Sequence, residues 1–329
     1  MNKSTRVVAT RALHGSALEN LARRFDLQIW PERRAPSPEA LVALARDCDG
    51  LLCLLTDRID AALFERCPRL RVVSSVSVGV DHVDLAAATA RGIPVGHTPG
   101  VLTETTADLA FALLLAAARR VAEGDRFVRA GGWTPERVWE PDMLLGQDIH
   151  GATLGLIGLG AIGQAMARRA QGFGMRVVAW SRTQRDVPGV EFVSLESLLA
   201  AADFVSVHVA LTAETRGLLG AAAIARMKRG AVLVNTARGG IVDEAALADA
   251  LRSGQLRAAG LDVFAREPLE VASPLRDLPN VVLTPHIGSA SEATRARMID
   301  LAVQNLLAAL AGERMPHCAN PAVYAPAIA

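Results

Sequence analysis

The sequence of 329 residues lacks a surplus of either charge, because 35 Lys and Arg are balanced by 34 Asp and Glu, for a formal net charge of +1. Nucleic-acid-binding proteins usually carry a basic excess or stripe, so this balance argues against a nucleic-acid partner. Long hydrophobic runs are also missing. The longest, 110–118, is bounded by Asp108 and Arg119 and falls far short of the roughly 20 residues that a bilayer span needs. No membrane partner is therefore expected.

Cysteine is scarce, and the spacing of the four cysteines matches no metal-binding motif. Cys48, Cys53, Cys67 and Cys318 form no C-x-x-C pair and no other spacing typical of metal ligands. We therefore expect no zinc or other metal site and no disulfide framework. Residues 1–6 lead into a short strand-like run without the hydrophobic region of a secretory signal. Together these features predict a globular protein of the reducing cytoplasm.

The first third of the chain alternates short apolar runs with helical patterns. This alternation predicts βαβ units and a largely parallel sheet. Hydrophobic residues make up 51% of the chain, enough for a sizeable core, and the length suggests two domains. The predicted strands are 6–10, 27–30, 50–54, 71–76 and 93–95, and the predicted helices are 38–46, 61–67 and 84–90.

A long helix is predicted over 103–129, with Thr105 and Asp108 in a capping pattern at its start. Its middle, 109–118, is apolar on every face, which is typical of a helix buried on all sides. We expect this helix to lie between domains or between subunits.

A second alternation starts at Thr153. The predicted strands are 153–157, 176–180, 204–209, 231–235, 258–261 and 281–283, with helices over 162–173, 195–201, 221–227 and 244–253. Six strands with crossover helices form the pattern of a doubly wound dinucleotide-binding fold, so an α/β class is predicted. A final amphipathic helix, 291–311, precedes a proline-containing tail, 316–329.

A glycine-rich motif, G-x-G-x-x-G, occurs at Gly158, Gly160 and Gly163, between the first strand and the first helix of this second alternation. In that context Gly158 permits a tight turn, Gly160 lets the backbone approach a pyrophosphate, and Gly163 lets helix and strand pack closely. The amides of Ala161 and Ile162 would then point at phosphate from a helix N-terminus. The alternative, a glycine-rich turn that binds nothing, is less favoured by these flanks.

The loop after the next strand carries no acid before Asp186, although NAD sites usually place Asp or Glu here to bind the ribose 2′-hydroxyl. Hydroxyls and cations suited to a 2′-phosphate take its place. They are Ser181, Arg182, Thr183 and Arg185. We predict a preference for NADPH, with NAD also possible, against the alternative of an ordinary solvated loop.

Three polar side chains each follow a later predicted strand: Arg238, Glu267 and His286. Because ligands bind outside the carboxyl ends of parallel strands, all three should converge on the cofactor side. Arg238 can clamp a carboxylate and polarise the neighbouring carbonyl. His286 can exchange a proton with a ketone oxygen, and Glu267 can fix its tautomer and favour its charged form. Each residue alone could be an ordinary surface or turn residue; their joint placement favours catalysis.

Further segments carry a family resemblance, namely 51–55, 77–82, 98–107, 131–133 and 285–289. Together with the spacing of Arg238, Glu267 and His286, they resemble the D-isomer-specific 2-hydroxyacid dehydrogenases over nearly the whole chain, and in detail the glyoxylate/hydroxypyruvate reductases. The resemblance implies an NAD(P)H-dependent oxidoreductase.

The resemblance also implies roles for single residues. Val78 and Gly79 resemble the loop whose amides bind the substrate carboxylate, and Ser289 lies beside His286. Residues implied to contact the cofactor are Thr106, His208, Val209, Ala210, Thr215, Thr236, Ala237, Arg238, Asp262, His286 and Gly288. Without the family, Asp262 would be interpreted as a strand-end cap and Thr106 as a helix N-terminal residue.

The family fold implies two Rossmann-like doubly wound parallel-sheet domains. A flavodoxin-like substrate-binding domain would comprise 1–100 and 289–329, and the NAD(P)-binding domain would comprise 101–288. A homodimer is implied as well, and Trp139 lies in the segment that the family exchanges between subunits.

The leading hypothesis is an NADPH-preferring reductase of small 2-keto acids (glyoxylate, hydroxypyruvate or the longer 2-ketogluconate) that yields D-2-hydroxy acids. One alternative is an NAD-linked dehydrogenase of the D-lactate or phosphoglycerate type. Another is a non-catalytic, NAD(P)-sensing corepressor-like module on the same fold.

Overall fold

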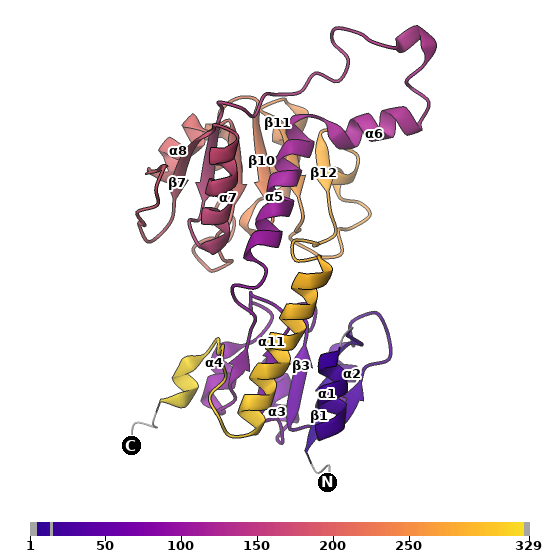
Figure 1. Ribbon diagram of the computed structural model, residues 1–329, viewed down its shortest axis with the longest axis vertical. Helices are drawn as coiled ribbons and strands as arrows, with labels where there is room; N and C mark the ends of the chain where they lie inside the picture. The colour runs from indigo at the N-terminus through magenta and orange to yellow at the C-terminus, as the bar shows by residue number, and fades with distance from the viewer. Residues whose placement is uncertain (1–4, 14–15, 326–329) are drawn as a thin grey trace. The chain divides into compact units, whose positions relative to one another are not determined.

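The computed structural model describes residues 5–13 and 16–325, and the chain divides into two compact units (Figure 1). One unit consists of Met1–Leu102 and Ala290–Ala329, and the other of Thr103–Ser289. Each is built on a parallel sheet, which confirms the predicted α/β class. Predictions for residues 1–4 and for the end of the tail, 326–329, lie outside the described residues.

The first unit contains five parallel strands within its described residues, in the order β2-β1-β3-β4-β5. This is the flavodoxin-like order that the family resemblance implied. The strands are β1 (Arg6–Ala9), β2 (Asp26–Ile29), β3 (Gly50–Cys53), β4 (Val72–Ser75) and β5 (Val95–Gly96).

Helices cover both faces of this sheet, because apolar side chains alternate along its strands. Val7 and Ala9 of β1 pack on one face, and Val8 packs on the other. The first face is covered by α1 (Ser16–Arg24) and α11 (Glu292–Leu310), and the second by α2 (Pro38–Ala45), α3 (Ala61–Arg66) and α4 (Leu85–Ala90). Helix α1 was not predicted, since its apolar stripe is only three residues long: Ala17, Leu18 and Leu21.

The second unit contains seven parallel strands among its described residues, in the order β12-β11-β10-β9-β6-β7-β8. They are β6 (Thr153–Ile157), β7 (Arg176–Trp180), β8 (Val190–Phe192), β9 (Phe204–Val207), β10 (Ala231–Asn235), β11 (Leu256–Leu261) and β12 (Val281–Leu283). The short edge strand β8 was not predicted. The chain starts at β6, runs outward to β8 and returns on the other side at β9. The order therefore reverses between β6 and β9, where such sheets bind ligands.

Two helical layers also cover the second sheet. In Figure 1, α5 (Thr103–Ala118) and α7 (Ala161–Gly172) lie in front of the strands. The opposite face packs against α8 (Leu195–Ala201), α9 (Ala221–Arg226) and α10 (Glu244–Arg252). Single turns of 3-10 helix occur at Pro135–Arg137, Gly239–Ile241, Pro274–Arg276 and Pro321–Tyr324.

The predicted helix over 103–129 is wrong in its length. It is broken into α5, which ends at Ala118, and α6 (Val121–Arg129), with Arg120 between them at a φ of 54°. The break coincides with the return of the chain, because Gln147 donates its amide to the Ala118 carbonyl (2.9 Å). A local sequence pattern cannot predict this break, because the contact involves a residue 29 positions away along the chain.

Another expectation for this helix also needs correction. Helix α5 begins at Thr103, so Thr105 lies inside the first turn and does not cap it. Most of the apolar side chains of α5 are buried within the second unit, against the sheet and α7. A place for this helix between domains or between subunits stays a prediction.

Capping side chains mark the starts of many helices. A side-chain oxygen accepts the backbone N–H of the second or third helical residue, which satisfies one of the unpaired donors there. This occurs at Ser37, Asp60, Asp84, Ser194, Asp243 and Ser291. Among the described residues no helix is both long enough and apolar enough to cross a membrane.

Candidate active site

The glycine turn between β6 and α7 lies at the point where the strand order reverses. Gly158 has a φ of 105°, and a Cβ there would lie 2.6 Å from the carbonyl carbon of His208, which follows β9. A Cβ on Gly163 would lie 2.1 Å from the carbonyl oxygen of Gly158. Both positions therefore require glycine, as the motif predicted, because the turn is pressed between the helix and the neighbouring strand.

Gly160 differs from these two glycines. A Cβ there would meet nothing within 4 Å, so open space lies in front of the N-terminus of α7. Gly160 is the N-cap residue of this 12-residue helix, and no side chain caps it. The amides that open the helix, including Ala161 and Ile162, are thus presented to open space with the positive end of the helix dipole. This cradle fits the pyrophosphate of a dinucleotide such as NAD or NADP.

The end of β9 forms the other side of the reversal point. Nε2 of His208 is hydrogen-bonded to the hydroxyl of Ser206 (2.9 Å), and burial lowers the pKa of His208 to about 4. His208 is therefore neutral at pH 7. Further along, Thr215 donates its hydroxyl to the carbonyl of Ala210 (2.6 Å), which ties together the loop that also carries Val209. Ser206 was missed at the sequence level, since a buried serine inside a strand gives no signal.

The loop after β7 is exposed. Arg182, Thr183 and Arg185 stand in solvent, and the hydroxyl of Ser181 donates to the carbonyl of Thr183 (2.6 Å). Glu214 lies close enough to Arg182 for the two charges to interact. Hydrogen bonds from Thr212 and from the backbone, with a smaller contribution from Arg182, lower the pKa of Glu214.

Arg238 is carried by a turn that the side chain of Asn235 builds. The Asn235 amide donates to the carbonyl of Arg238 (2.9 Å), and its oxygen accepts the N–H of Ala237 (3.0 Å). Asn235 is buried at the end of β10 and was missed by the sequence analysis. The hydroxyl of Thr236 is buried and has no hydrogen-bond partner in the described part of the chain. A polar ligand at this edge, such as the cofactor, would satisfy it.

The next residue, Gly239, joins this turn to the following loop. A Cβ there would lie 1.8 Å from the backbone of Phe264, so only glycine permits the approach. Phe264 in turn donates its N–H to Oε1 of Glu267 (3.0 Å). The close approach therefore sets the Arg238 turn against the loop that holds Glu267.

Glu267 and His286 form a direct pair, with Oε2 of Glu267 2.7 Å from Nδ1 of His286. Burial acts to raise the pKa of Glu267, but the hydrogen bonds from His286 and Phe264 and the charges of His286 and Arg238 together lower it. The carboxylate is thus ionised at neutral pH and can only accept. Nδ1 of His286 must therefore donate, which leaves Nε2 to exchange a proton with a substrate.

Asp262 holds the loop that carries His286. Its fully buried carboxylate accepts the amides of Ile287 and Gly288 (both 2.8 Å) and the hydroxyl of Thr284 (2.6 Å). His286 has a φ of 54°, uncommon for a residue other than glycine, and these bonds hold the loop in that shape. The structure therefore shows Asp262 as a cap at the end of its strand. A contact of Asp262 with the cofactor carboxamide stays a prediction.

The remaining predicted site residues are divided between the two units. Thr106, in the first turn of α5, donates its hydroxyl to the carbonyl of Gly288 (3.1 Å), and Ser289 is the last residue of the second unit. Val78 and Gly79 belong to the first unit, in the loop after β4. Among the described residues, no group of three or more His, Cys, Asp or Glu could hold a metal ion.

Known proteins match this chain along nearly its whole length. Two curated relatives named glyoxylate reductase, from Korarchaeum cryptofilum and Aeropyrum pernix, are 50% and 47% identical to it, over 97% of this chain and 96% of theirs. Among solved structures, a protein from Thermus thermophilus has a TM-score of 0.90 at 52% identity, covering 96% of this chain and 100% of its own.

A second solved structure is an NADPH-dependent glyoxylate/hydroxypyruvate reductase from Sinorhizobium meliloti, in complex with NADP and malonate. Its TM-score is 0.86 at 35% identity, covering 95% of this chain and 96% of its own. The family model of the D-isomer specific 2-hydroxyacid dehydrogenase NAD binding domain matches residues 111–288, which include the glycine turn, Arg238, Glu267 and His286. The chain therefore belongs to the D-isomer-specific 2-hydroxyacid dehydrogenase family, whose members are NAD(P)H-dependent oxidoreductases.

Proposed function

We propose that this protein reduces small 2-keto acids, with glyoxylate and hydroxypyruvate as its main substrates and 2-ketogluconate as a longer one, to D-2-hydroxy acids. The observation that carries the proposal is the pair formed by His286 and Glu267, with Arg238 near enough for its charge to lower the pKa of Glu267. The relatives from Korarchaeum cryptofilum and Aeropyrum pernix, both named glyoxylate reductase, support the choice of substrate.

The proposed chemistry assigns one task to each residue. When bound, reduced NADP supplies the hydride that reaches the keto carbon. Nε2 of His286 donates a proton to the keto oxygen, and the ionised Glu267 stabilises the imidazolium that must precede this transfer. Arg238 binds the substrate carboxylate and polarises the neighbouring carbonyl. The amides of Val78 and Gly79 also bind that carboxylate, and Ser289 lines the substrate site.

We further propose that NADPH is the preferred cofactor. Arg182 and Arg185 are exposed after β7, on the side where the adenosine ribose of a dinucleotide lies in this fold. No carboxylate precedes them in this loop to bind a 2′-hydroxyl. The Sinorhizobium meliloti relative, described as NADPH-dependent, supports the same preference.

Turnover distinguishes this proposal from its alternatives. A panel of 2-keto acids of increasing length, assayed with NADPH and NADH, should show steady NADPH oxidation with glyoxylate and hydroxypyruvate. Faster turnover with NADH and pyruvate would favour an NAD-linked D-lactate type. Tight dinucleotide binding without any turnover would favour a corepressor-like module.

The substitution His286→Gln tests the proton donor. Because general acid catalysis contributes typically ~10²–10⁴-fold, kcat for glyoxylate should fall by that range while the Kd of NADPH stays unchanged. The control is His150→Gln, since His150 lies in the same unit but bonds only the carbonyl of Phe173 among the contacts described, and should keep full activity. An unchanged kcat in the His286 variant would refute the mechanism.

The double substitution of Arg182 and Arg185 by alanine tests the cofactor preference. Loss of charge-assisted contacts to a 2′-phosphate should lower kcat/KM for NADPH about tenfold or more and leave the NADH value nearly unchanged. Arg176→Ala is the matched control, because Arg176 lies at the opposite end of β7 and pairs with Glu191. A wild-type protein that prefers NADH would contradict the proposal.

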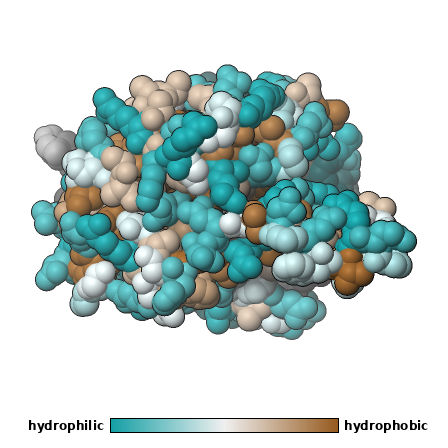
Figure 2. All heavy atoms as spheres, turned by 90° about the horizontal axis from the view of Figure 1, so that it is seen from above, coloured by the Kyte–Doolittle hydropathy of each residue, from teal (hydrophilic) through white to brown (hydrophobic). Residues whose placement is uncertain are grey.

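We also propose a homodimer formed through the segment from Val121 to Leu145. Six of the ten large apolar side chains that are strongly exposed among the described residues lie in it: Val121, Val128, Trp133, Val138, Trp139 and Leu145. In Figure 2, brown hydrophobic residues lie among teal ones on the part that projects to the right, where Figure 1 places this segment.

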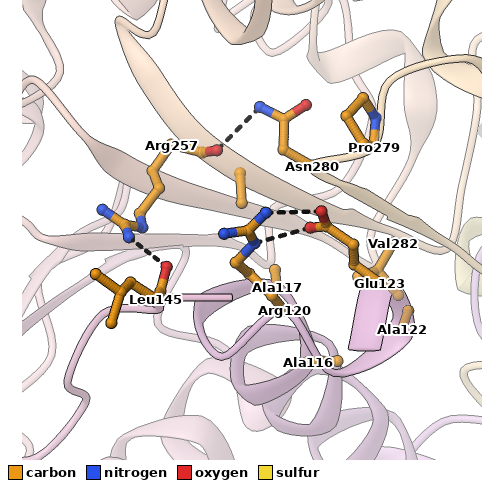
Figure 3. Close-up of a pocket in the computed structure, with 11 residues that line it drawn as sticks. Ala116, Ala117, Arg120, Ala122, Glu123, Leu145, Arg257, Pro279, Asn280 and Val282 are labelled. Carbon is orange, nitrogen blue, oxygen red and sulfur yellow. Dashed lines mark hydrogen bonds and ion pairs between the residues drawn. The ribbon is translucent and has the colours of Figure 1, made fainter. Parts of the chain in front are cut away.

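A pocket of about 260 Å³ opens at the base of this segment. Figure 3 shows that Arg120 and Glu123 pair through two hydrogen bonds (2.7 and 2.8 Å) on one side of it, and that Arg257 donates to the carbonyl of Leu145 on the other. Much of the lining is apolar: Ala116, Ala117, Ala122, Leu145, Ala258 and Val282. A twofold interface pairs the same surface patch of two copies, and Leu145 belongs both to the exposed segment and to the lining of the pocket. We therefore assign the segment of a second copy as the occupant of the pocket.

Mass measurement in solution tests the dimer. Wild type should have twice the 34.7 kDa mass of the chain, and Trp133→Ser combined with Trp139→Ser should shift the mass towards a monomer. Val271→Ser provides the control, because this residue is 88% exposed but lies outside the segment. A monomeric wild type, or a double variant that remains a dimer, would contradict the assignment.

A further inference from the structure

The loop after β4 has three consecutive carbonyl groups that each accept a hydrogen bond from a defined donor. The carbonyl of Ser77 accepts the N–H of Thr98 (2.8 Å). The carbonyl of Val78 lies 3.0 Å from Nδ1 of His97, and that of Gly79 accepts the hydroxyl of Ser77 (2.8 Å). All of these groups belong to the first unit.

The hydrogen bonds behind Gly79 have one direction. Its carbonyl can only accept, so the single hydroxyl proton of Ser77 points at it. Ser77 must then accept from the hydroxyl of Ser75 (2.7 Å), and Ser75 accepts from Nε2 of His82 (3.0 Å). Both serines are buried, which removes water as a competing partner. The chain of donors thus runs from His82 through Ser75 and Ser77 to the Gly79 carbonyl.

A neighbouring thiol does not reverse this direction. Burial raises the pKa of Cys53, which lies beside Ser75, so Cys53 remains a thiol at neutral pH. Its S–H can donate to the second lone pair of the Ser75 oxygen. The hydroxyl proton of Ser75 remains directed at Ser77.

His97 is itself held in place from two sides. Its backbone carbonyl accepts the side-chain amide of Asn305 on α11 (2.8 Å), and its N–H donates to the carbonyl of His317 (3.2 Å). Asn305 is fully buried and also accepts the N–H of His317 (3.0 Å). Nδ1 of His97 must be protonated to donate to the Val78 carbonyl, which fixes its tautomer when the ring is neutral.

The hydrogen bonds that hold the carbonyl groups also fix the direction of the amide N–H groups in the same peptides. In a trans peptide the N–H points opposite to the C=O of the same unit. The carbonyl of Ser77, held by the Thr98 amide, therefore sets the N–H of Val78. The carbonyl of Val78, held by His97, sets the N–H of Gly79. The carbonyl of Gly79, held by Ser77, sets the N–H of Val80 and so fixes the peptide that follows Gly79.

Neither the amide of Val78 nor that of Gly79 donates to another group within the described residues, and both residues are partly exposed. Both amides are therefore available to donate to an anionic ligand such as a carboxylate.

We propose that His97 is a positioning residue that aims the amide of Gly79 at the substrate carboxylate, and that the chain His82–Ser75–Ser77 holds the peptide after Gly79, so that this residue is fixed from both sides. The inference rests on the proposed function, in which these amides bind the carboxylate of a 2-keto acid. None of the four side chains touches the substrate. They fix the peptide planes before binding, so that the loop does not have to be ordered by the substrate.

Two pairs of variants test the inference. His97→Leu and Ser77→Ala each remove one donor, whereas His97→Asn and Ser77→Thr each keep one at the same place. KM and kcat for glyoxylate are measured, together with the Kd of NADPH and the Kd of oxamate, a non-reducible 2-keto acid analogue, in the presence of NADPH. Thr98→Val is the matched control, because the Thr98 hydroxyl is buried without a partner among the described residues.

We expect the constants for substrate binding to change and those for turnover and cofactor binding to stay nearly the same. His97→Leu and Ser77→Ala should raise KM for glyoxylate and Kd for oxamate about tenfold, with kcat and the Kd of NADPH nearly unchanged. His97→Asn and Ser77→Thr should recover most of the loss, and Thr98→Val should resemble wild type. If Ser77→Ala does not fold, the His97 pair decides, because His97 is partly exposed.

Two failures are distinguishable. If wild type is active but KM and oxamate binding are unchanged in both His97→Leu and Ser77→Ala, the inference is wrong and the proposed function stands. If wild type reduces no 2-keto acid with either cofactor, the proposed function fails and oxamate binding alone decides. The inference then survives only if wild type binds oxamate and the two donor-deleting variants bind it about tenfold more weakly.

Discussion

The hydrogen bond of 2.7 Å between His286 and Glu267 is the interaction on which the chemistry that we propose for this protein depends. It joins two loops that follow neighbouring strands, β11 and β12, and it decides which nitrogen of the imidazole remains available. The bond has this effect only because Glu267 stays ionised. Burial opposes ionisation, and the donors around the carboxylate, with the charge of Arg238, outweigh it.

Most of the surrounding structure serves to hold these loops. Asn235 shapes the Arg238 turn, Gly239 lets that turn approach the backbone of Phe264, and Asp262 ties down the segment that carries His286. These residues perform no chemistry themselves. They fix geometry at the carboxyl ends of parallel strands, where a sheet offers rigid anchors and loops remain free to vary. The loop after β4 follows the same principle, with side chains that hold carbonyls so that amides face outward.

The features that depend on local sequence patterns could be predicted from the sequence alone. Gly158 and Gly163 were predicted because a turn between strand and helix needs them, and the structure shows the collisions that a Cβ would cause. Arg238, Glu267 and His286 were predicted because each follows a strand of one parallel sheet. The parallel α/β class came from the alternation of strands with helices, and the flavodoxin-like character of the first sheet came from the family resemblance.

Features that depend on distant contacts could not be predicted. The break at Arg119–Arg120 depends on the amide of Gln147, and no local pattern marks it. Helix α1 has too narrow an apolar stripe, and β8 is a short edge strand with half-exposed side chains. Likewise, the contact of His97 with Val78 joins loops after different strands. Such contacts arise only when the sheet brings the ends of its strands together.

The most direct test of the account is a single-turnover measurement of NADPH oxidation with saturating glyoxylate, comparing wild type with Glu267→Gln. This substitution keeps the size of the side chain but removes the charge that fixes Nδ1 of His286 as a donor. The account predicts a hydride-transfer step slowed roughly tenfold or more, with unchanged affinity for NADPH. An unchanged rate of transfer would contradict it, because the Glu267–His286 pair would then have no part in the reaction.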